Sequence, residues 1–560
     1  MNRGKYVGLF LVLVMLMMVF SVSVSAQSMK VLNTGIAMVG ADPETIDPNL
    51  NQDSQGNTLI RTMYIGLTTQ NAETGDIMPG IATDWSVSDD GLTWTFNMIH
   101  DIPWVKYNPD TDAVEQVMDD AGNPRYVTAN DVVNSWKRVL DPATASPYAY
   151  VPAEYVVGGV AANDGSGSVD DLAVEALDDY TFQITAPEAV GFAANIYGLW
   201  MVNPIPQWAI DECGEAWTEP DCMESYGPFA LKDWSHEESL TFVKNPFWPG
   251  TEYVPQAKLD EVVFHLLDPQ TQFAEYEAGT LDAIAPPIEQ LDRIKSDATL
   301  SQELSIGTNP CTYYLGINLE KPVVGDSVHM RRALSYAIDR QSIVDNVTKG
   351  GQIPARWFAR PGLNAAPTLE TNPDLGVGYD PDMAKQELDL ALTDLGVASA
   401  ADIPTITLAV NDSAGHTAIM QAIQQMWTDT LGITVEISAR ESSTYWSSLA
   451  EDAPQVYRAG WCQDYPDADN FDRGVYRSDS SQNYGHFNSP EFDKLVDEAH
   501  LETDTETRRG QYAQAEEILV HDVVGQIPIY WYTTVQMTKP NVERTYSVIN
   551  REAFETWDIS

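Results

Sequence analysis

The chain has 560 residues, of which 82 are acidic and 31 are basic, giving a formal charge of −51. This negative field would repel a nucleic-acid backbone and an anionic membrane surface, so neither partner is expected. Apolar residues make up 44% of the chain, which excludes a disordered protein, and the length predicts two or three lobes. Solubility or adaptation to salt explains the acidity, with attraction of cationic ligands as the alternative.

The first 26 residues have the pattern of a secretory signal peptide. Arg3 and Lys5 precede the apolar run Val7–Phe20, which is too short to span a membrane. The small residues Val24–Ala26 then form a cleavage site before Gln27, and no Cys follows that would carry a lipid anchor. No later stretch is apolar over about 18 residues. We therefore expect a periplasmic or extracellular protein without membrane insertion after signal cleavage.

Hydrophobic periodicity predicts strands and helices over most of the remaining chain. Apolar residues typical of strands cover Leu92–Met98, Ile406–Val410, Ile433–Ile437 and Ile527–Tyr532. Helical spacing covers Met383–Leu395, Ala418–Leu431 and Tyr512–Leu519. Asp380 is the expected N-cap of the first of these helices, and Gly396 and Gly432 are expected to end the first two. The strand–helix–strand unit over 406–437 predicts an α/β fold with mixed sheets.

Two acidic segments that contain glycine interrupt this pattern, Asn108–Gly122 and Gly158–Asp170. We expect both to be surface loops rather than domain boundaries, because loops of this composition cannot bury a core.

Four cysteines in an exported chain favour disulfides over free thiols. Cys213 and Cys222 are near neighbours in an acidic loop and are predicted to pair. Cys311 and Cys462 would then form a long-range bridge that stabilises the fold by about 4–5 kcal/mol in the chain-entropy model. Zinc is the competing interpretation, but the spacings lack paired C-x-x-C motifs or nearby histidines, so no metal site is expected.

No catalytic motif is found: the chain lacks a G-x-S-x-G elbow, an H-E-x-x-H helix and a phosphate-binding G-x-x-x-x-G-K-[ST] loop. The acidic run from Asp464 to Asp472 resembles calcium-ligand spacing but lacks the glycine that the EF-hand turn requires. Paired carboxylates for glycoside hydrolysis are not excluded by sequence. We expect a protein that is not an enzyme and that needs no cofactor.

Several blocks together resemble the extracellular solute-binding proteins of family 5, which serve oligopeptide, dipeptide and nickel transporters. The blocks are Pro79–Trp85 with Asp90–Phe96, Thr128–Trp136, Tyr226–Phe229 with Trp234 and Asn245-Pro246, and Asn318 with Arg331–Arg340. Three further stretches are similar to the oligopeptide-binding branch, namely Asp141–Tyr148, Cys311–Tyr314 and Arg458–Tyr465. In that branch the two cysteines that match Cys311 and Cys462 resemble a disulfide pair beside the ligand.

The resemblance implies a periplasmic-binding-protein-like α/β fold, with two lobes joined by a hinge and an extra third domain. It implies these domains: a signal peptide (1–26), a discontinuous domain I (27–64, 192–310 and 530–560), a domain II (65–191) and a domain III (311–529).

The resemblance also assigns roles to residues in the cleft. Asp464 matches a carboxylate that pairs with the α-ammonium of the peptide, and its alternative is an exposed loop acid. Arg458 and His416 match groups that bind peptide carboxylates, and their alternatives are a structural ion pair and a helix start. Further residues are expected to line the cleft or to offer backbone groups to an extended peptide: Tyr148, Trp461, Tyr532, Gly460, Cys462, Gln52 and Ser54.

The chain departs from the branch at Ser442, Leu449 and Thr348, where it lacks an aromatic residue, an arginine and a lysine. These departures leave the preferred peptide length and sequence open. The resemblance implies a monomer that captures short peptides and delivers them to an ABC transporter permease and its ATPase. The alternatives are the same fold with a non-peptide cargo, such as a metal chelate or an oligosaccharide, and a secreted hydrolase.

Overall fold

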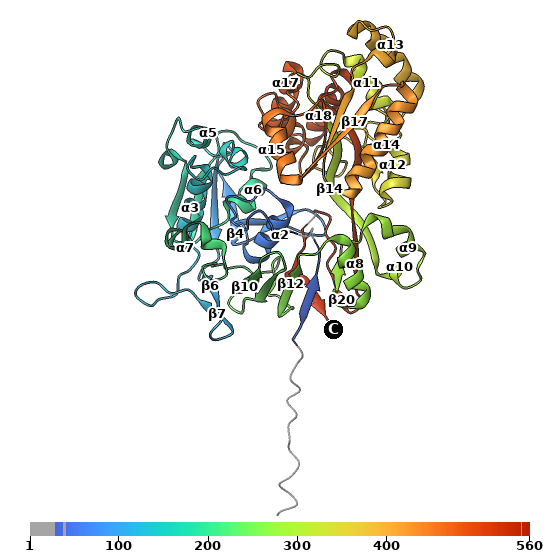
Figure 1. The fold of residues 1–560 in the computed structure, drawn as a ribbon. Coiled ribbons are helices and arrows are strands. Elements are labelled where there is room, and N and C mark those ends of the chain that lie inside the picture. The colour runs from blue at the N-terminus through green and yellow to red at the C-terminus, as the bar shows by residue number, and fades with distance from the viewer. Residues whose placement is uncertain (1–28, 37, 39–40, 550) are drawn as a thin grey trace, which may run out of the picture.

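Two strands connect the two lobes of the protein in the computed structural model, which describes residues 29–36, 38, 41–549 and 551–560 (Figure 1). These are β14 (Leu304–Ile317) and β19 (Gln526–Thr538), which are antiparallel neighbours. Their pairing runs from Leu304–Met537 in one lobe to Gly316–Gln526 in the other, with a register shift between Thr308 and Thr312. The predicted signal peptide lies outside the described residues.

A mixed sheet passes through both lobes in the order β10-β11-β12-β1-β13-β19-β14-β18-β16-β17, and β15 also pairs with β19. In the first lobe it contains β10 (Phe229–Ser235), β11 (Ser239–Lys244), β12 (Glu261–His265), β1 (Val31–Thr34) and β13 (Ala283–Ile284). In the second it contains β15 (Ile353–Pro354), β18 (Val456–Cys462), β16 (Ile406–Asn411) and β17 (Val435–Arg440). β1 and β12 are parallel, as are β16 and β17, whereas β14 and β18 are antiparallel. The predicted α/β class with mixed sheets is confirmed.

A separate four-stranded sheet with the order β4-β5-β9-β8 forms the part of the first lobe that lies away from the crossing strands (Figure 1). It consists of β4 (Ala82–Val87), β5 (Thr93–Met98), β8 (Val174–Asp178) and β9 (Thr181–Thr185). Three helices precede β8 in the chain, namely α3 (Ala129–Leu140), α4 (Tyr150–Ala153) and α5 (Gly159–Asn163). The predicted alternation in 92–98 is confirmed, because Trp94, Phe96 and Met98 are buried.

The helices of the first lobe are α2 (Ser54–Met63), α6 (Ala193–Ile196), α7 (Gln207–Cys213), α8 (Pro269–Ala278), α9 (Leu291–Ser296) and α10 (Leu300–Glu303). Those of the second lobe are α11 (Val328–Tyr336), α12 (Arg340–Ile343), α13 (Pro381–Leu395), α14 (Ala414–Leu431), α15 (Ser442–Asp452), α16 (Asp472–Tyr476), α17 (Pro490–Leu501) and α18 (Thr505–Glu517). Short strand pairs complete the chain: β2 (Thr68–Gln70) with β3 (Ile77–Pro79), β6 (Val105–Asn108) with β7 (Ala113–Gln116), and β20 (Val542–Glu543) with β21 (Asp558–Ile559).

Local sequence signals set the ends of the helices in the second lobe. The Asp380 side chain accepts hydrogen bonds from the first backbone N–H groups of α13, and Gly396 ends that helix with φ 67°. Gly432 ends α14 in the same left-handed conformation, with φ 69°. Glycine adopts this conformation without the steric cost that a Cβ imposes. The helices and the strand–helix–strand unit predicted from sequence are confirmed.

The acidic segment 108–122 differs from its prediction as a loop, because part of it forms the hairpin strand β7. The buried side chains of Val105, Tyr107 and Val114 pack against Ala230 in the neighbouring sheet. This tertiary packing stabilises a hairpin that the polar composition of the segment does not indicate. The second predicted loop, 158–170, likewise contains the short helix α5.

Both lobes have hydrophobic cores of their own. One large core includes Leu32, Phe96 and Phe242 in the first lobe, and two others fill the second lobe around Leu315 and Phe358. The predicted domain boundaries at residues 311 and 529 fall within the two crossing strands. The separate cores support the division between the two lobes, whereas one core spans the proposed domains I and II, so the three-domain division stays a proposal.

Disulfides join the two predicted cysteine pairs. Cys213–Cys222 closes a short segment, and Cys311–Cys462 links directly opposite residues of β14 and β18. Both predicted pairings are confirmed. Among the described residues, no helix combines the length and the apolar character that crossing a membrane requires.

Candidate functional site

A cavity of about 1170 Å³ lies between the two lobes. On the first lobe it is lined by one face of α2 and by Tyr148 and Trp200, and on the second by Ala459–Asp464. Asn309 and Thr533 of the crossing strands line it between these walls. A cavity of this volume, bounded by both lobes and by the strands that connect them, can enclose a ligand when the lobes close.

The first wall follows from the helical spacing of α2. Ser54, Asn57, Thr58 and Arg61 line the cavity and lie on one face, because residues three and four apart stack along a helix. The side chain of Asp53 caps the helix by accepting a hydrogen bond from the N–H of Gly56 at 2.8 Å. Four polar side chains therefore face the cavity from an element that is fixed at its N-terminus.

The second wall is the end of β18, which has one free edge. Cys462 and Gly460 pair with Cys311 and Tyr313 of β14 on one side. On the other side β16 reaches only Val456 and Tyr457, so no strand in the described chain pairs with that edge of residues 459–462. An unpaired edge offers backbone N–H and C=O groups to an extended peptide.

Asp464 follows this edge and is buried, with 7% of its surface exposed. Asn470 donates a hydrogen bond to Asp464 Oδ2 at 3.0 Å, and the Tyr148 hydroxyl of the first lobe lies 3.5 Å from Oδ1. Burial raises the pKa of Asp464 to about 6, although these hydrogen bonds and the charge of Arg61 favour the ionised form. The alternative of an exposed loop acid does not hold, and a ligand cation would relieve the cost of this buried charge.

We expect peptide binding to weaken below pH 6. An ammonium on Asp464 favours the ionised carboxylate, so the bound complex has a lower pKa than the free protein and protons compete with the peptide. Affinity is then constant above pH 7 and falls by about tenfold at pH 5. Calorimetric titrations between pH 5 and 8 measure this, and the Asp464→Asn variant should show a flat profile. A wild-type affinity that rises toward pH 5 contradicts the assignment.

Arg458, His416 and Tyr532 form a second cluster behind the cavity wall. Arg458 Nη2 donates to the Tyr532 hydroxyl at 3.0 Å, and its guanidinium carbon lies 4.9 Å from the centre of the Tyr313 ring. The ring centres of His416 and Tyr313 are 5.6 Å apart. The three predicted residues do not line the cavity. A Cβ at Gly460 would nevertheless lie 3.5 Å from Arg458 Nη2, so the guanidinium lies directly behind the wall.

Arg458 and His416 of this cluster are shielded from solvent, which affects the partners of the first and the pKa of the second. Arg458 is buried, its recorded partners are uncharged, and its Nε has no hydrogen bond among the described residues. The alternative of a structural ion pair therefore finds no support in the described chain. Burial and the charge of Arg458 lower the pKa of His416 to about 3, so its ring is neutral at pH 7. An ionic role for His416 would require a ligand carboxylate that raises this pKa.

Seven of the ten predicted ligand residues line the interlobe cavity: Gln52, Ser54, Tyr148, Gly460, Trp461, Cys462 and Asp464. Their contact with a ligand stays a prediction. Sequence reasoning missed Arg61, Trp200, Trp446 and Tyr484, which also line it. The helical spacing that follows Ser54 could have indicated Arg61, whereas the others depend on tertiary contacts.

The acids that follow Asp464 have partners within the second lobe. Asp467 pairs with Arg508 at 2.6 Å, and Asp469 accepts a hydrogen bond from His500 at 2.9 Å. Burial raises the pKa of Asp469, but the charges of His500 and Arg473 outweigh it and hold that pKa well below its ordinary value. Asp467 and Asp469 are therefore already engaged by cationic or hydrogen-bonding partners of the protein itself.

Two kinds of contact join the lobes beside the cavity. Phe192 of the first lobe stacks on Tyr465 with ring centres 5.0 Å apart. Glu154 Oε2 lies 2.5 Å from Arg473 Nη1. The lobes therefore touch outside the cavity, in contacts that stabilise this arrangement of the lobes without a ligand.

We expect the Glu154→Gln variant to bind peptide up to about fivefold more weakly, because a partly exposed ion pair between the lobes contributes at most about 1 kcal/mol to closure. High salt should weaken the wild type toward the variant. Titration calorimetry at 50 mM and 500 mM salt measures both effects. An unchanged affinity at low salt would show that the pair adds nothing to closure.

Residues 76–483 match the model of the bacterial extracellular solute-binding proteins, family 5 Middle. The oligopeptide-binding protein OppA of Bacillus subtilis is 32% identical over 514 residues, which cover 90% of this chain and 88% of that protein. The structure of Haemophilus influenzae OppA in complex with RPPGFSPFR has a TM-score of 0.80 and 28% identity, and covers 95% of this chain and 99% of that one.

A further relative has two structures with which the arrangement of the lobes can be compared. The Escherichia coli murein tripeptide binding protein MppA is 26% identical and covers 95% of this chain and 99% of its own, with a TM-score of 0.81. Its unliganded open form gives a TM-score of 0.68, covering 95% of this chain and 98% of its own. The lobes of this chain are thus arranged less like the open form.

Proposed function

The chain belongs to family 5 of the bacterial extracellular solute-binding proteins, and on that premise we propose that it captures short oligopeptides for an ABC importer. One observation carries the peptide cargo: the buried Asp464 lies in the same interlobe cavity as the free edge of β18. The carboxylate suits an α-ammonium and the edge suits a peptide backbone, and every peptide with a free N-terminus has both.

Capture follows from contacts with both lobes. A peptide that pairs with Asp464 and β18 on one lobe and contacts α2 and Tyr148 on the other binds the closed form more tightly than the open form. Its binding energy therefore shifts the population toward closure. The two crossing strands, β14 and β19, are the only connections that such a movement has to bend in the described chain.

Further parts of the proposal rest on the family and on the N-terminal sequence rather than on the cavity. The mature chain begins at Gln27 in the periplasm or outside the cell, acts as a monomer without catalysis, and delivers its cargo to a membrane permease powered by an ATPase. Light scattering of the purified chain tests the monomer, and the N-terminal sequence of the exported protein tests the cleavage site.

Native mass spectrometry of the purified chain from Gln27 onward, followed by release and identification of retained ligands, tests the cargo. A mixture of intact short peptides supports the proposal and gives their length directly. A single non-peptide compound or a metal complex would keep the fold but overturn the peptide cargo. Hydrolysis of added peptides during long incubation would instead favour an enzyme.

A further inference from the structure

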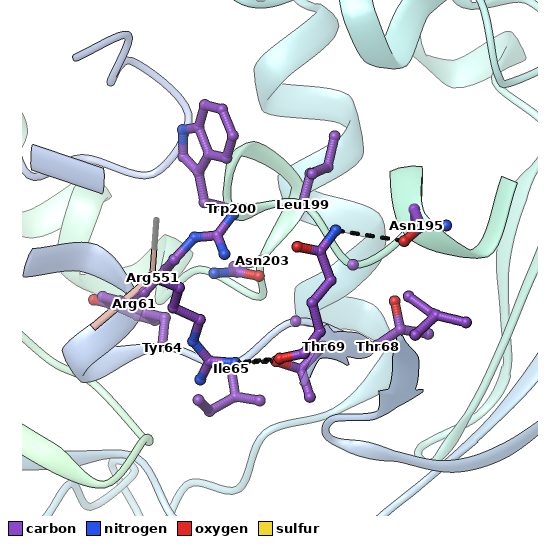
Figure 2. A pocket seen from close by; sticks show the side chains of 14 residues that line it. Arg61, Tyr64, Ile65, Thr68, Thr69, Asn195, Leu199, Trp200, Asn203 and Arg551 are labelled. Carbon is purple, nitrogen blue, oxygen red and sulfur yellow. Dashed lines mark hydrogen bonds between the residues drawn. The ribbon is translucent and has the colours of Figure 1, made fainter. Parts of the chain in front are cut away.

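A second, smaller space adjoins the first-lobe wall of the interlobe cavity. It has a volume of about 30 Å³ and is lined by Arg61, Arg551, Trp200 and Asn203, among others. Figure 2 shows Arg61 and Arg551 on one side of this space and Asn195 on the other. Arg61 and Trp200 also line the large cavity. Arg61 therefore lies between the two spaces.

The two arginines have very different partners. Arg551 donates to Thr69 Oγ1 at 2.6 Å and to Glu555 Oε1 at 3.2 Å, so its charge is balanced. Arg61 has neither a hydrogen bond nor an ion pair with any described residue, and its buried Nε is among the atoms without a partner. Its one recorded contact is with the Trp200 ring, whose centre lies 5.9 Å from the guanidinium carbon. A guanidinium without an acceptor is costly at a partly buried site.

Arg61 also has an unusual position among the charges of the large cavity. It is the one cationic side chain among the described residues that line this cavity. The acidic residues that line it are Asp42, Glu44, Asp53, Asp464 and Glu552. Among the described lining residues, Arg61 is therefore the one that can meet an acidic ligand group directly, whereas Arg458 lies behind the wall at Gly460.

The position of Arg61 indicates which end of a peptide it would meet. Its charge acts on Asp464, which we have assigned to the α-ammonium. Tyr148 lies between these groups in the wall, because it contacts Asp464 at 3.5 Å and its ring centre is 5.2 Å from that of Trp200. A carboxylate and a guanidinium thus face the same end of the cavity without pairing with each other.

The size of the small space limits what can satisfy Arg61. The small space has about 30 Å³ and the interlobe cavity about 1170 Å³, so the interlobe cavity is the one with room for a peptide. A peptide carboxylate therefore approaches the guanidinium from the large cavity, where the fork of N–H donors matches its two oxygens. Burial and the nearby charge of Arg551 lower the pKa of Arg61 to about 10, so it is still charged at pH 7.

We propose that Arg61 makes the receptor selective for peptides with an acidic side chain in the first or second residue. This inference rests on the proposed peptide-binding function. The α-ammonium pairs with Asp464 while the side-chain carboxylate pairs with Arg61, so the ligand neutralises both groups. The described lining offers no second cationic side chain to an acidic residue further along the peptide.

The test compares tetrapeptides of alanine with a single glutamate or glutamine at each position, measured by titration calorimetry. In the wild type, glutamate at position one or two should bind at least about tenfold more tightly than glutamine, and at positions three and four no more tightly. In Arg61→Gln this preference should disappear, and Arg61→Lys should retain part of it. Lys137→Gln is the matched control, because it removes one positive charge from a surface lysine that pairs with Asp170.

The outcomes separate this inference from the function on which it rests. If no tetrapeptide binds the wild type, the peptide-binding function and the inference both fail. If glutamate and glutamine peptides bind equally well at every position, only the inference fails. A preference that persists in Arg61→Gln assigns it to another group and also overturns the inference. If Arg61→Gln does not fold, the position scan of the wild type can still overturn the inference, and a reduced preference in Arg61→Lys assigns it to Arg61.

Discussion

Replacing Asp464 by asparagine is expected to weaken peptide binding by about 30- to 4000-fold. The side chain keeps its shape and its hydrogen bond with Asn470, but the charge that pairs with the α-ammonium is lost. Removing one partner of a buried charge pair costs about 2–5 kcal/mol, and each 1.4 kcal/mol is a factor of ten in affinity. Titration calorimetry with one peptide on both proteins measures the loss.

The same experiment with an N-acetylated peptide identifies the group that Asp464 binds. Acetylation removes the ammonium, so the wild type should lose affinity by a similar factor, and Asp464→Asn should lose little more. Asp452→Asn is a suitable control, because Asp452 lies on the surface in a pair with Lys321. If Asp464→Asn binds as tightly as the wild type, Asp464 does not hold the α-ammonium and another class of cargo becomes the better explanation.

The elements that could be predicted from sequence are those with local signals. The cap at Asp380 and the glycines at 396 and 432 define α13 and α14 because hydrogen bonds close in the chain set these ends. The hairpin β6–β7 lacked such a signal. Its few apolar side chains are buried against Ala230, which lies more than a hundred residues later in the chain.

The candidate site likewise contains residues that a local stretch of sequence locates and others that only the folded structure reveals. Asp464 and the edge of β18 lie within one short stretch of sequence, so a family resemblance in that stretch locates both. Arg61 indicates a binding site only in the folded structure, where it lies near Arg551 and its Nε lacks a hydrogen-bond partner. The absence of a carboxylate partner is a property of the folded surroundings, and no sequence pattern reports it. Arg458, likewise, is expected in the cavity wall but lies behind Gly460.

We expect the double variant Cys311→Ser/Cys462→Ser to lose about 5 kcal/mol of unfolding free energy. The two cysteines are 151 residues apart in the chain, and closing a loop of that length removes much of the conformational entropy of the unfolded chain. The variant Cys213→Ser/Cys222→Ser is the matched control. Its loop spans a separation of 9 residues, so the same model gives a loss of about 2.5 kcal/mol. Urea unfolding of the three proteins measures both differences.

The longer bridge should also affect the ligand, whereas the shorter one should not. Cys462 lines the cavity and lies opposite Cys311 at the end of β18, next to the free edge that is proposed to bind the peptide backbone. Without the bridge this end can separate from β14, and ordering it again on binding costs conformational entropy. The long-range variant should therefore bind peptide more weakly than the wild type, and Cys213→Ser/Cys222→Ser should bind like the wild type. Equal affinities in all three proteins would mean that the bridge stabilises the second lobe without positioning its binding edge.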